Sequence, residues 1–222
     1  MKVALFDFDG TLYPYETFNI LLEQLKTHPK YKENYKKFVR YFAPYYFGYK
    51  IKIVKKAKMQ QKALEYYLKS FKDNSRSEIE QFFSDVAKDM TGDLRLSLIN
   101  RIKQLQADHY YIMLVSGAFV PLLESIFKGL NIDCIIGSQV NFKGDSLDVE
   151  SPFERIFADR KVEIIKNHFK EEEVDWSGSY AYSDSITDLK MLELVGKPVA
   201  VKPDSELFNV ASAKDWRIHT VD

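Results

Sequence analysis

The hydrophobic pattern of the chain begins as a strand and then changes to helical spacing. Val3 to Asp7 is a short apolar run with β-branched and aromatic residues, which is typical of a buried strand. From about residue 15 to residue 90 the apolar positions recur at helical spacing and predict about four helices. The predicted breaks between these helices are Pro29, Pro44–Gly48 and Asn74–Ser75. Ser75 and Glu78 have the spacing of a helix capping box.

After Gly92 the pattern alternates between helical stretches and short apolar strands. Helices are predicted at 93–107, 119–129, 160–169, 185–195 and 204–213, and strands at 110–115, 132–136, 138–142, 179–183, 198–201 and 217–221. A hairpin or loop is expected around Gly144. Such alternation is typical of a parallel sheet covered by helices. We therefore predict an α/β fold with a core domain of residues 1–14 and 91–222. Residues 15–90 would form an inserted helical domain that acts as a lid over the strand ends.

Composition places the chain among globular proteins. Of the 222 residues 45% are hydrophobic and 29% are charged, with 9 Gly and 7 Pro, which excludes collagen-like and disordered classes. The longest nearly apolar stretch, Tyr110 to Leu123, is interrupted and too short to span a membrane. Asp7 and Asp9 come too early for a secretory signal to be expected. A single cysteine, Cys134, allows no internal disulfide, so the cytoplasm is the expected compartment.

Charge is distributed unevenly along the chain, although 32 basic and 32 acidic residues balance. Residues 21–72 contain 14 Lys or Arg against three Glu, and nine of the twenty residues 31–50 are Tyr or Phe. Two interpretations stay open for the basic aromatic segment 31–58. It could form the core of the helical domain with solvated lysines. It could also receive a bulky apolar or anionic leaving group, such as a lipid phosphate, through peripheral contact with a membrane. No nucleic-acid recognition motif is present, so nucleic acid is not an expected partner.

Polar residues follow three of the predicted strands. They are Asp7 and Asp9 after the first strand, Ser116 and Gly117 after strand 110–115, and Asp184 and Asp188 after strand 179–183. Acidic groups at buried strand ends repel one another and need a cation. Mg²⁺ is the natural candidate because it takes oxygen ligands. Ser116, the Gly117 amide and Lys161 would supply groups that bind a phosphate.

The ordered set of these residues resembles the four motifs of the haloacid dehalogenase-like phosphohydrolases. The motifs are Asp7-Phe8-Asp9-Gly10-Thr11, Ser116, Lys161 and Ser183-Asp184-Ser185-Ile186-Thr187-Asp188. Residues 15–90 are similar to the small helical, C1-type cap of the phosphoserine-phosphatase-like branch of that family. The resemblance implies a Rossmann-like three-layer core with a parallel sheet, and an active site beneath the inserted cap.

The resemblance also implies a role for each matched residue in the first and last motifs. Asp7 would be the nucleophile that forms an aspartyl-phosphate. Asp9 would protonate the leaving alcohol and then activate the attacking water. Mg²⁺ would be held by Asp7, the backbone carbonyl of Asp9 and Asp184. Asp188 would orient Lys161 or a metal-bound water.

Phosphate binding and substrate recognition are implied for the remaining residues. Ser116 and the Gly117 amide would bind phosphate oxygens, and Lys161 would neutralise the phosphate. Glu16 matches the glutamate with which phosphoserine phosphatases bind the amine of their substrate. A solvated acid at a helix start is the alternative for Glu16. Arg40 is the only arginine between Glu16 and residue 76, and its spacing does not identify it as a partner for a substrate carboxylate.

The expected function is a Mg²⁺-dependent phosphomonoester hydrolase that acts on a small diffusible phosphomonoester, with phosphoserine as one candidate. A phosphotransferase, a phosphomutase or a lipid-phosphate phosphatase would use the same site. A protein that binds a phosphorylated metabolite without turnover is the non-enzymatic alternative. The sequence leaves the substrate and the oligomeric state open.

Overall fold

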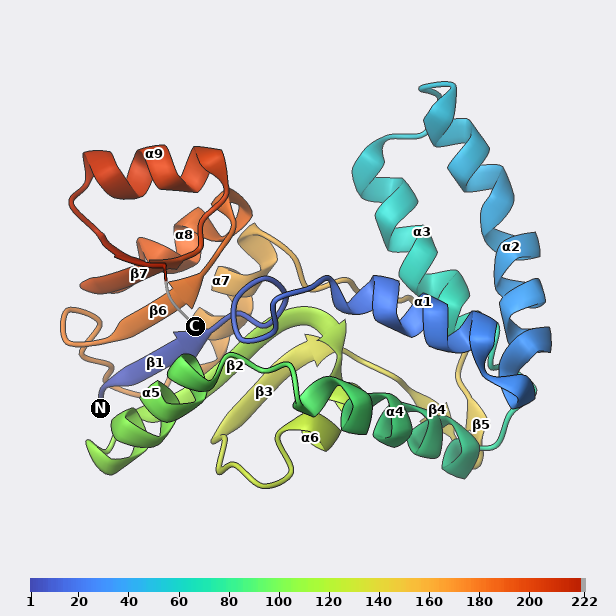
Figure 1. Ribbon diagram of the computed structural model, residues 1–222, viewed down its shortest axis with the longest axis horizontal. Helices are drawn as coiled ribbons and strands as arrows, with labels where there is room; N and C mark the ends of the chain where they lie inside the picture. The colour runs from blue at the N-terminus through green and yellow to red at the C-terminus, as the bar shows by residue number, and fades with distance from the viewer. Residues whose placement is uncertain (221–222) are drawn as a thin grey trace.

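The computed structural model describes residues 1–220 and contains a six-stranded parallel sheet (Figure 1). The strand order is β3-β2-β1-β6-β7-β8. These strands are β1 (Val3–Phe6), β2 (Tyr111–Phe119), β3 (Cys134–Ser138), β6 (Tyr180–Ser183), β7 (Lys197–Val201) and β8 (Arg217–His219). A separate antiparallel hairpin is formed by β4 (Phe142–Lys143) and β5 (Ser146–Leu147).

Strand β1 lies at the centre of the sheet. Ala4 pairs with Ile112 of β2 on one side and with Tyr180 of β6 on the other. All four residues of β1 are fully buried, as expected for a strand that is covered on both faces. Because the three strands run in the same direction, their carboxyl ends lie at one edge of the sheet. The residues that follow β1, β2 and β6 are therefore brought together.

Helices cover both faces of the sheet and make the core a three-layer structure. They are α5 (Leu96–Ala107), α6 (Val120–Ile126), α7 (Asp159–His168), η2 (Ile186–Asp188), α8 (Leu189–Leu192) and α9 (Ser205–Ala213). Side chains of β1 alternate between two apolar clusters. Ala4 and Phe6 pack in a cluster with α5 and α6, and Val3 and Leu5 pack in a cluster with α7, α8 and α9. The predicted α/β fold with a parallel sheet is confirmed.

The segment between β1 and α5 folds as four α-helices. They are α1 (Thr17–Thr27), α2 (Lys32–Lys50), α3 (Lys56–Lys69) and α4 (Arg76–Thr91), with the 3₁₀ turn η1 (Pro29–Tyr31) between α1 and α2. In Figure 1, α2 and α3 lie side by side and project away from the sheet, whereas α4 packs against α6. Tyr67 of α3 stacks on Phe119 of β2 with ring centroids 5.9 Å apart, and its hydroxyl donates to the Leu21 carbonyl at 3.1 Å. This aromatic contact holds the insertion over the carboxyl edge of the sheet. The division at residues 14/15 and 90/91 stays a prediction.

Two of the predicted helix breaks are confirmed. The 3₁₀ turn η1 begins at Pro29 and separates α1 from α2. At the other break Ser75 caps α4, and its side chain and that of Glu78 form the reciprocal hydrogen bonds of a capping box. The hairpin expected around Gly144 is also present, with Gly144 at φ +63°.

The break predicted at Pro44–Gly48 is wrong, because α2 runs through these residues to Lys50. Proline removes one backbone donor from a helix, and we attribute the tolerance here to aromatic packing along α2. Phe38 and Phe42, for example, stack with ring centroids 5.3 Å apart. The chain reverses just after α2, where the Val54 amide donates to the Gly48 carbonyl at 3.0 Å. A Cβ at Gly48 would lie 2.7 Å from the Val54 side chain, so glycine permits this tight return.

The strand predicted at 138–142 is also wrong. Strand β3 ends at Ser138, which pairs with Phe119, the last residue of β2. Beyond this point β2 offers no further residues with which 139–142 could pair. The predicted strand 217–221 is represented by β8, and residue 221 lies outside the described residues. None of the described helices is both long enough and apolar enough to cross a membrane.

Candidate active site

The carboxyl edge of the sheet carries a cavity of about 520 Å³, which we call the catalytic cavity. Its lining includes all eight residues predicted from the sequence: Asp7, Asp9, Glu16, Ser116, Gly117, Lys161, Asp184 and Asp188. The ends of β1, β2 and β6 and the start of α7 supply the residues of the core. Helix α3 closes the opposite side of the cavity with Lys56 and Gln60. The fold thus gathers residues that lie far apart in the sequence.

A buried ion triad joins Asp7, Lys161 and Asp188. Lys161 Nζ lies 2.7 Å from Asp7 Oδ1 and 2.6 Å from Asp188 Oδ2, and Lys161 is only 4% exposed. Ser183 Oγ donates a hydrogen bond of 2.8 Å to the same oxygen of Asp188. Burial opposes the charged form of Lys161, but the two carboxylates outweigh this effect and raise its pKa above the ordinary value. Lys161 is therefore a fixed positive charge beside one oxygen of Asp7.

A hydroxyl group lies between the carboxylates of Asp7 and Asp184. Thr11 Oγ1 is 3.2 Å from Asp7 Oδ2 and 3.2 Å from Asp184 Oδ1. Burial raises the pKa of Asp7 well above its usual range, even though Lys161 lowers it. Burial also raises the pKa of Asp184 to about 6. Two desolvated acids that both contact one hydroxyl group form a site that a bound cation would stabilise.

The loop after β1 passes very close to Asp184. Gly10 has φ +73°, and a Cβ at this position would overlap the Asp184 carboxylate, so glycine is required here. The Arg95 guanidinium donates to the carbonyls of Gly10 and Thr11 at 3.2 and 2.9 Å. Sequence reasoning missed Arg95, because nothing in the pattern before α5 distinguishes it from a surface arginine. These hydrogen bonds help to fix the loop that carries Asp9.

Asp9 is held by the first residue of α1. The Thr17 amide donates to Asp9 Oδ1 at 3.0 Å, and the Thr17 hydroxyl donates to the same oxygen. Burial raises the pKa of Asp9 to about 6, although these hydrogen bonds lower it. A carboxyl group with this pKa can both give and accept a proton near neutral pH. Sequence reasoning missed Thr17, although a threonine at a helix start was an available signal.

Ser116 and Gly117 line the wall of the catalytic cavity where the pairing of β2 with β3 becomes irregular. Ser116 is fully buried, and its Oγ accepts a hydrogen bond of 3.0 Å from the Ala118 amide. The Gly117 carbonyl accepts a hydrogen bond of 2.7 Å from Ser138 Oγ. The local backbone is thus fixed on both sides, which suits a hydroxyl and an amide that bind an anion.

The donor set at this edge fits Mg²⁺. The carboxylates of Asp7 and Asp184 and the backbone carbonyl of Asp9 are hard oxygen ligands, and Mg²⁺ usually keeps several waters as well. Asp188 Oδ1 is buried without a hydrogen-bond partner, so it is able to accept from such a water. Within residues 1–220 no three His, Cys, Asp or Glu side chains form a ready-made metal cluster. A site with two carboxylates, one carbonyl and water needs no such cluster.

Arg155 completes the side of the catalytic cavity that faces the helical insertion, and sequence reasoning missed it. Its Nη1 donates to Gln60 Oε1 at 3.1 Å, and its guanidinium lies 4.1 Å from the ring centroid of Phe157. Burial lowers the pKa of Arg155, and the nearby Glu16 carboxylate raises it. Glu16 itself is exposed beside the start of α1 and makes no capping hydrogen bond. Glu16 therefore does have an arginine beside it, but from a distant segment.

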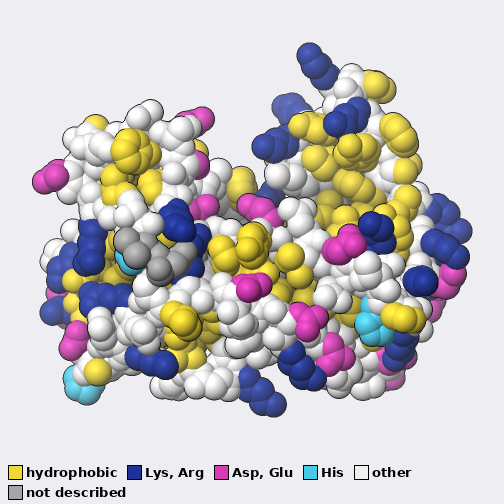
Figure 2. Space-filling model, viewed as in Figure 1, with side chains coloured by type: hydrophobic (Ala, Val, Ile, Leu, Met, Phe, Trp, Pro, Cys, Tyr) yellow, Lys and Arg dark blue, Asp and Glu magenta, His cyan; other side chains and the backbone are white. Residues whose placement is uncertain are grey.

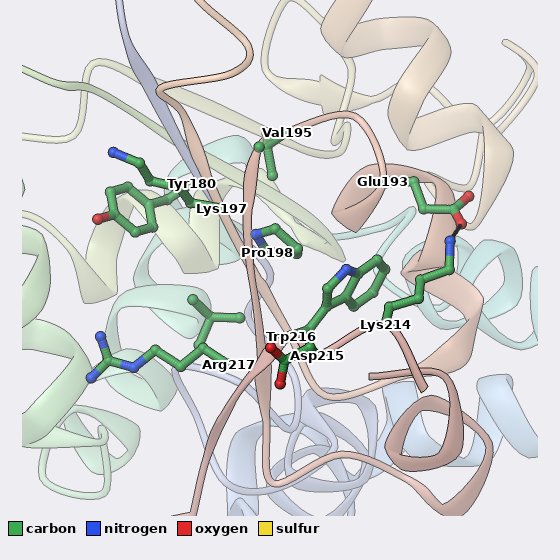
Figure 3. Close-up of a pocket in the computed structure, with 11 residues that line it drawn as sticks. Tyr180, Glu193, Val195, Lys197, Pro198, Lys214, Asp215, Trp216 and Arg217 are labelled. Atoms are coloured by element: carbon green, nitrogen blue, oxygen red, sulfur yellow. Dashed lines mark hydrogen bonds and ion pairs between the residues drawn. The ribbon is translucent and has the colours of Figure 1, made fainter. Parts of the chain in front are cut away.

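A wider hollow of about 810 Å³ lies at the opposite, amino-terminal ends of β6, β7 and β8 (Figure 3). Tyr180, Lys197 and Arg217, which begin these strands, line it. Lys214 Nζ lies 2.5 Å from Glu193 Oε1, so these two charges are already matched. The dashed line in the close-up marks this pair. None of the eight predicted site residues lines this hollow. We therefore assign the chemistry to the smaller catalytic cavity.

The fold and the site together define a class of protein. It has a Rossmann-like core, an Asp-x-Asp sequence after the central strand and a helical insertion over the strand ends. The chain belongs to the haloacid dehalogenase-like hydrolase family, whose sequence model matches residues 4–193. The family predicted from the four motifs is confirmed.

Similar proteins are known from several bacteria. The chain is 34% identical over 107 residues to the inhibition of morphological differentiation protein of Streptomyces azureus, which covers 48% of this chain and 39% of that protein. It is 26% identical over 118 residues to a phosphoserine phosphatase of Lactococcus lactis, which covers 53% and 54% respectively. The chain thus spans only about two fifths to one half of these relatives. A structure of a Bordetella pertussis protein of unknown function has TM-score 0.79 and 20% identity, covering 99% of this chain and 98% of that one.

Proposed function

We propose that the protein is a Mg²⁺-dependent phosphomonoester hydrolase that works through an aspartyl-phosphate on Asp7. The observation that carries the proposal is the setting of Asp7, whose buried carboxylate lies 2.7 Å from Lys161 Nζ and two residues before Asp9. Asp9, with a pKa of about 6, provides the proton donor that this chemistry requires. Family membership and the Lactococcus relative named phosphoserine phosphatase support the proposal.

In the first half of the reaction Asp7 is the nucleophile. One of its carboxylate oxygens bonds to phosphorus while the bond between phosphorus and the leaving oxygen breaks. Asp9 donates its proton to that oxygen, so the leaving group departs as a neutral alcohol. The Ser116 hydroxyl, the Gly117 amide and the Lys161 ammonium group bind the other phosphate oxygens and offset their negative charge.

In the second half of the reaction Asp9 has become a carboxylate and acts as a base. It takes a proton from a water molecule, the water oxygen bonds to phosphorus, and the bond between phosphorus and Asp7 breaks. Inorganic phosphate leaves, and Asp7 and Asp9 return to their starting states. Mg²⁺, when held by Asp7, the Asp9 carbonyl and Asp184, supplies positive charge that offsets the charge of the phosphate. The Thr17 hydrogen bonds keep the Asp9 carboxyl in place throughout.

Phosphate release from p-nitrophenyl phosphate, measured with and without Mg²⁺, tests this proposal. We expect release that depends on Mg²⁺ and is abolished by Asp7→Asn, whereas Asp215→Asn on the surface leaves it unchanged. Intact-protein mass spectrometry of Asp9→Asn should show a covalent phosphoryl group, because this variant lacks the base for the second step. Substantial turnover by Asp7→Asn would refute the nucleophile. An added alcohol that is phosphorylated in place of water would identify a phosphotransferase instead.

A further inference from the structure

A second cavity, of about 330 Å³, lies within the helical insertion, and we call it the cap chamber. Helices α1, α2 and α3 and the end of β2 form its walls. The apolar side chains that line it include Phe18, Leu21, Phe42, Ala63, Leu64 and Phe119. At roughly 30 Å³ per water-sized group, the cap chamber holds about eleven non-hydrogen atoms. A mainly apolar space of this size is able to bind an apolar group.

The cap chamber and the catalytic cavity meet at a shared set of residues. Five residues line both spaces, and we call them the neck: Asp9, Glu16, Gln60, Gly117 and Arg155. The proposed proton donor Asp9 is among them, so the leaving oxygen of a phosphomonoester bound at Asp7 would lie beside the opening of the cap chamber. The carboxylate of Glu16 offsets the charge of Arg155, as its effect on the pKa of Arg155 indicates. The neck therefore favours neither a strongly cationic nor a strongly anionic group.

We propose that the leaving group of the substrate is an apolar alkyl or aryl chain that passes the neck and ends in the cap chamber. This inference rests on the proposed function and names its substrate class. A sugar would bury several hydroxyl groups in the chamber, whose wall is mainly apolar. Asn19 and Tyr46 offer hydrogen-bond partners to few of them, and the rest would lie unpaired against side chains such as Phe18. An apolar chain instead gains stabilisation from each methylene that it removes from water. Glu16 and Arg155 remain beside the first atoms after the ester oxygen.

A ladder of n-alkyl phosphates from ethyl to decyl tests the proposal through kcat/KM for phosphate release. Each added methylene should raise kcat/KM by about fourfold until the cap chamber is full. In Ala63→Phe the new ring occupies part of the chamber, so the rise should end several carbons earlier. Met59→Trp fills the same chamber from a half-buried position and serves if Ala63→Phe does not fold. Ala213→Phe, on the exposed side of α9, is the matched control and should leave the ladder unchanged.

The outcomes separate this inference from the proposed function. Phosphate release that does not increase with chain length, or a ladder that Ala63→Phe and Met59→Trp leave unchanged, would overturn the assignment of the cap chamber. Release from no member of the series would refute the hydrolase instead. In that case calorimetric titration with alkylphosphonates of the same lengths still tests whether the cap chamber binds an alkyl chain. Affinity that rises with chain length supports it, and affinity that does not overturns it.

A different surface carries a second inference. The connection between α2 and α3 forms the end of the arm that projects from the core, and we call residues 47–55 the cap tip. Phe47, Ile51 and Ile53 of the cap tip are 64%, 66% and 77% exposed. Figure 2 shows hydrophobic side chains gathered over α2 and α3, with Lys and Arg side chains at the far end of the arm. Lys50, Lys52 and Lys55 lie in the cap tip, and no acidic residue occurs between residues 33 and 65.

We propose that the cap tip docks on an anionic lipid bilayer. Exposed aromatic and aliphatic side chains enter the interface while flanking lysines contact the headgroups. Charge complementarity selects this occupant, because each lysine near an anionic surface strengthens binding by about fivefold. A second copy of the chain would bring the same lysines together and is disfavoured by repulsion.

Co-sedimentation with vesicles of phosphatidylglycerol and phosphatidylcholine tests the docking, with phosphatidylcholine alone as the reference. We expect binding that requires the anionic lipid, weakens with salt and is lost in Phe47→Ser/Ile53→Ser. Leu96→Ser removes a side chain of similar exposure, 73%, at the start of α5 and should leave binding unchanged. Absence of sedimentation with anionic vesicles would overturn the proposal. A concentration-dependent dimer that the double substitution dissociates would also overturn it, because the cap tip would then bind another copy.

Discussion

The buried ion triad at the catalytic cavity makes Lys161→Met the most informative single substitution. Methionine has nearly the length of lysine but lacks its charge, so the change removes the ammonium group with little change in volume. Asp7 and Asp188 then lose the cation that lies 2.7 and 2.6 Å from their carboxylate oxygens. We expect a large loss of stability in addition to the loss of phosphate release.

The magnitude follows from the burial of the triad. Removing one partner of a buried ion pair destabilises a protein by about 3–5 kcal/mol, because the remaining charge is left desolvated. Lys190 offers a matched control, since it pairs with Asp159 at 2.5 Å but both side chains are more than half exposed. Breaking an exposed pair of this kind changes stability by about 1 kcal/mol or less. The two lysine-to-methionine substitutions should therefore differ by at least 2 kcal/mol.

Urea unfolding at about pH 7.5 measures this difference, with a chelator present so that no metal masks the charges. Fluorescence of Trp176, which packs on Phe169 with ring centroids 5.9 Å apart, reports on the core. Lys161→Met/Asp188→Asn should recover part of the loss, because the unpaired Asp188 charge is removed as well. If Lys161→Met is within about 1 kcal/mol of Lys190→Met, the triad does not have the energetic role that its burial indicates.

Three further predictions concern the acids of the catalytic cavity and the residues that hold them. Gly10→Ala should weaken Mg²⁺ binding by at least about tenfold in calorimetry, because the new Cβ displaces Asp184. Gly144→Ala places alanine at a similar φ, +63°, with open space around it, and should leave Mg²⁺ affinity unchanged. Thr17→Val removes a hydrogen bond that lowers the pKa of Asp9, so the descending limb of the pH profile of kcat/KM should move to higher pH. If this limb does not move, Asp9 is not the proton donor of the reaction. The metal-free protein should gain about 3 kcal/mol of stability between pH 7.5 and 5, because Asp9 and Asp184 have folded-state pKa values of about 6, above the unfolded value of 3.8. The free energy of unfolding should therefore fall as the pH rises through 6. If it does not change with pH in the presence of a chelator, the raised pKa values are contradicted.

The layered core could be predicted from the sequence because its elements follow local rules. The change from strand to helical spacing, the alternation after residue 92 and the Ser75 capping box each depend on residues close together in the chain. The prediction of a helix break at Pro44–Gly48 was wrong for the opposite reason. Whether a proline ends a helix depends on tertiary packing, here the contacts of Tyr41 and Tyr45 of α2 with Tyr66 of α3, which local rules do not contain.

The site divides in the same way between local motifs and distant contacts. Asp7, Asp9 and Asp184 follow strands, and parallel neighbouring strands bring such residues to one edge, so their meeting could be expected. The register that sets Lys161 within 2.7 Å of Asp7 could be expected only from the family resemblance. Thr17 acts through a hydrogen bond to Asp9 that depends on the geometry of the α1 start, and helical periodicity does not reveal it.

Arg155 shows why the determinants of substrate choice are harder to predict than those of chemistry. It lies in the irregular segment between β5 and α7, where no period places it, and it reaches the cavity by contact with Gln60 of the helical insertion. Phosphoryl transfer requires a fixed set of groups around one phosphorus atom, so it leaves a motif. A leaving group is met by whatever side chains line the cap chamber, such as Ala63, and many sequences supply an apolar wall of that volume. One core can therefore keep its reaction while its cap changes the substrate.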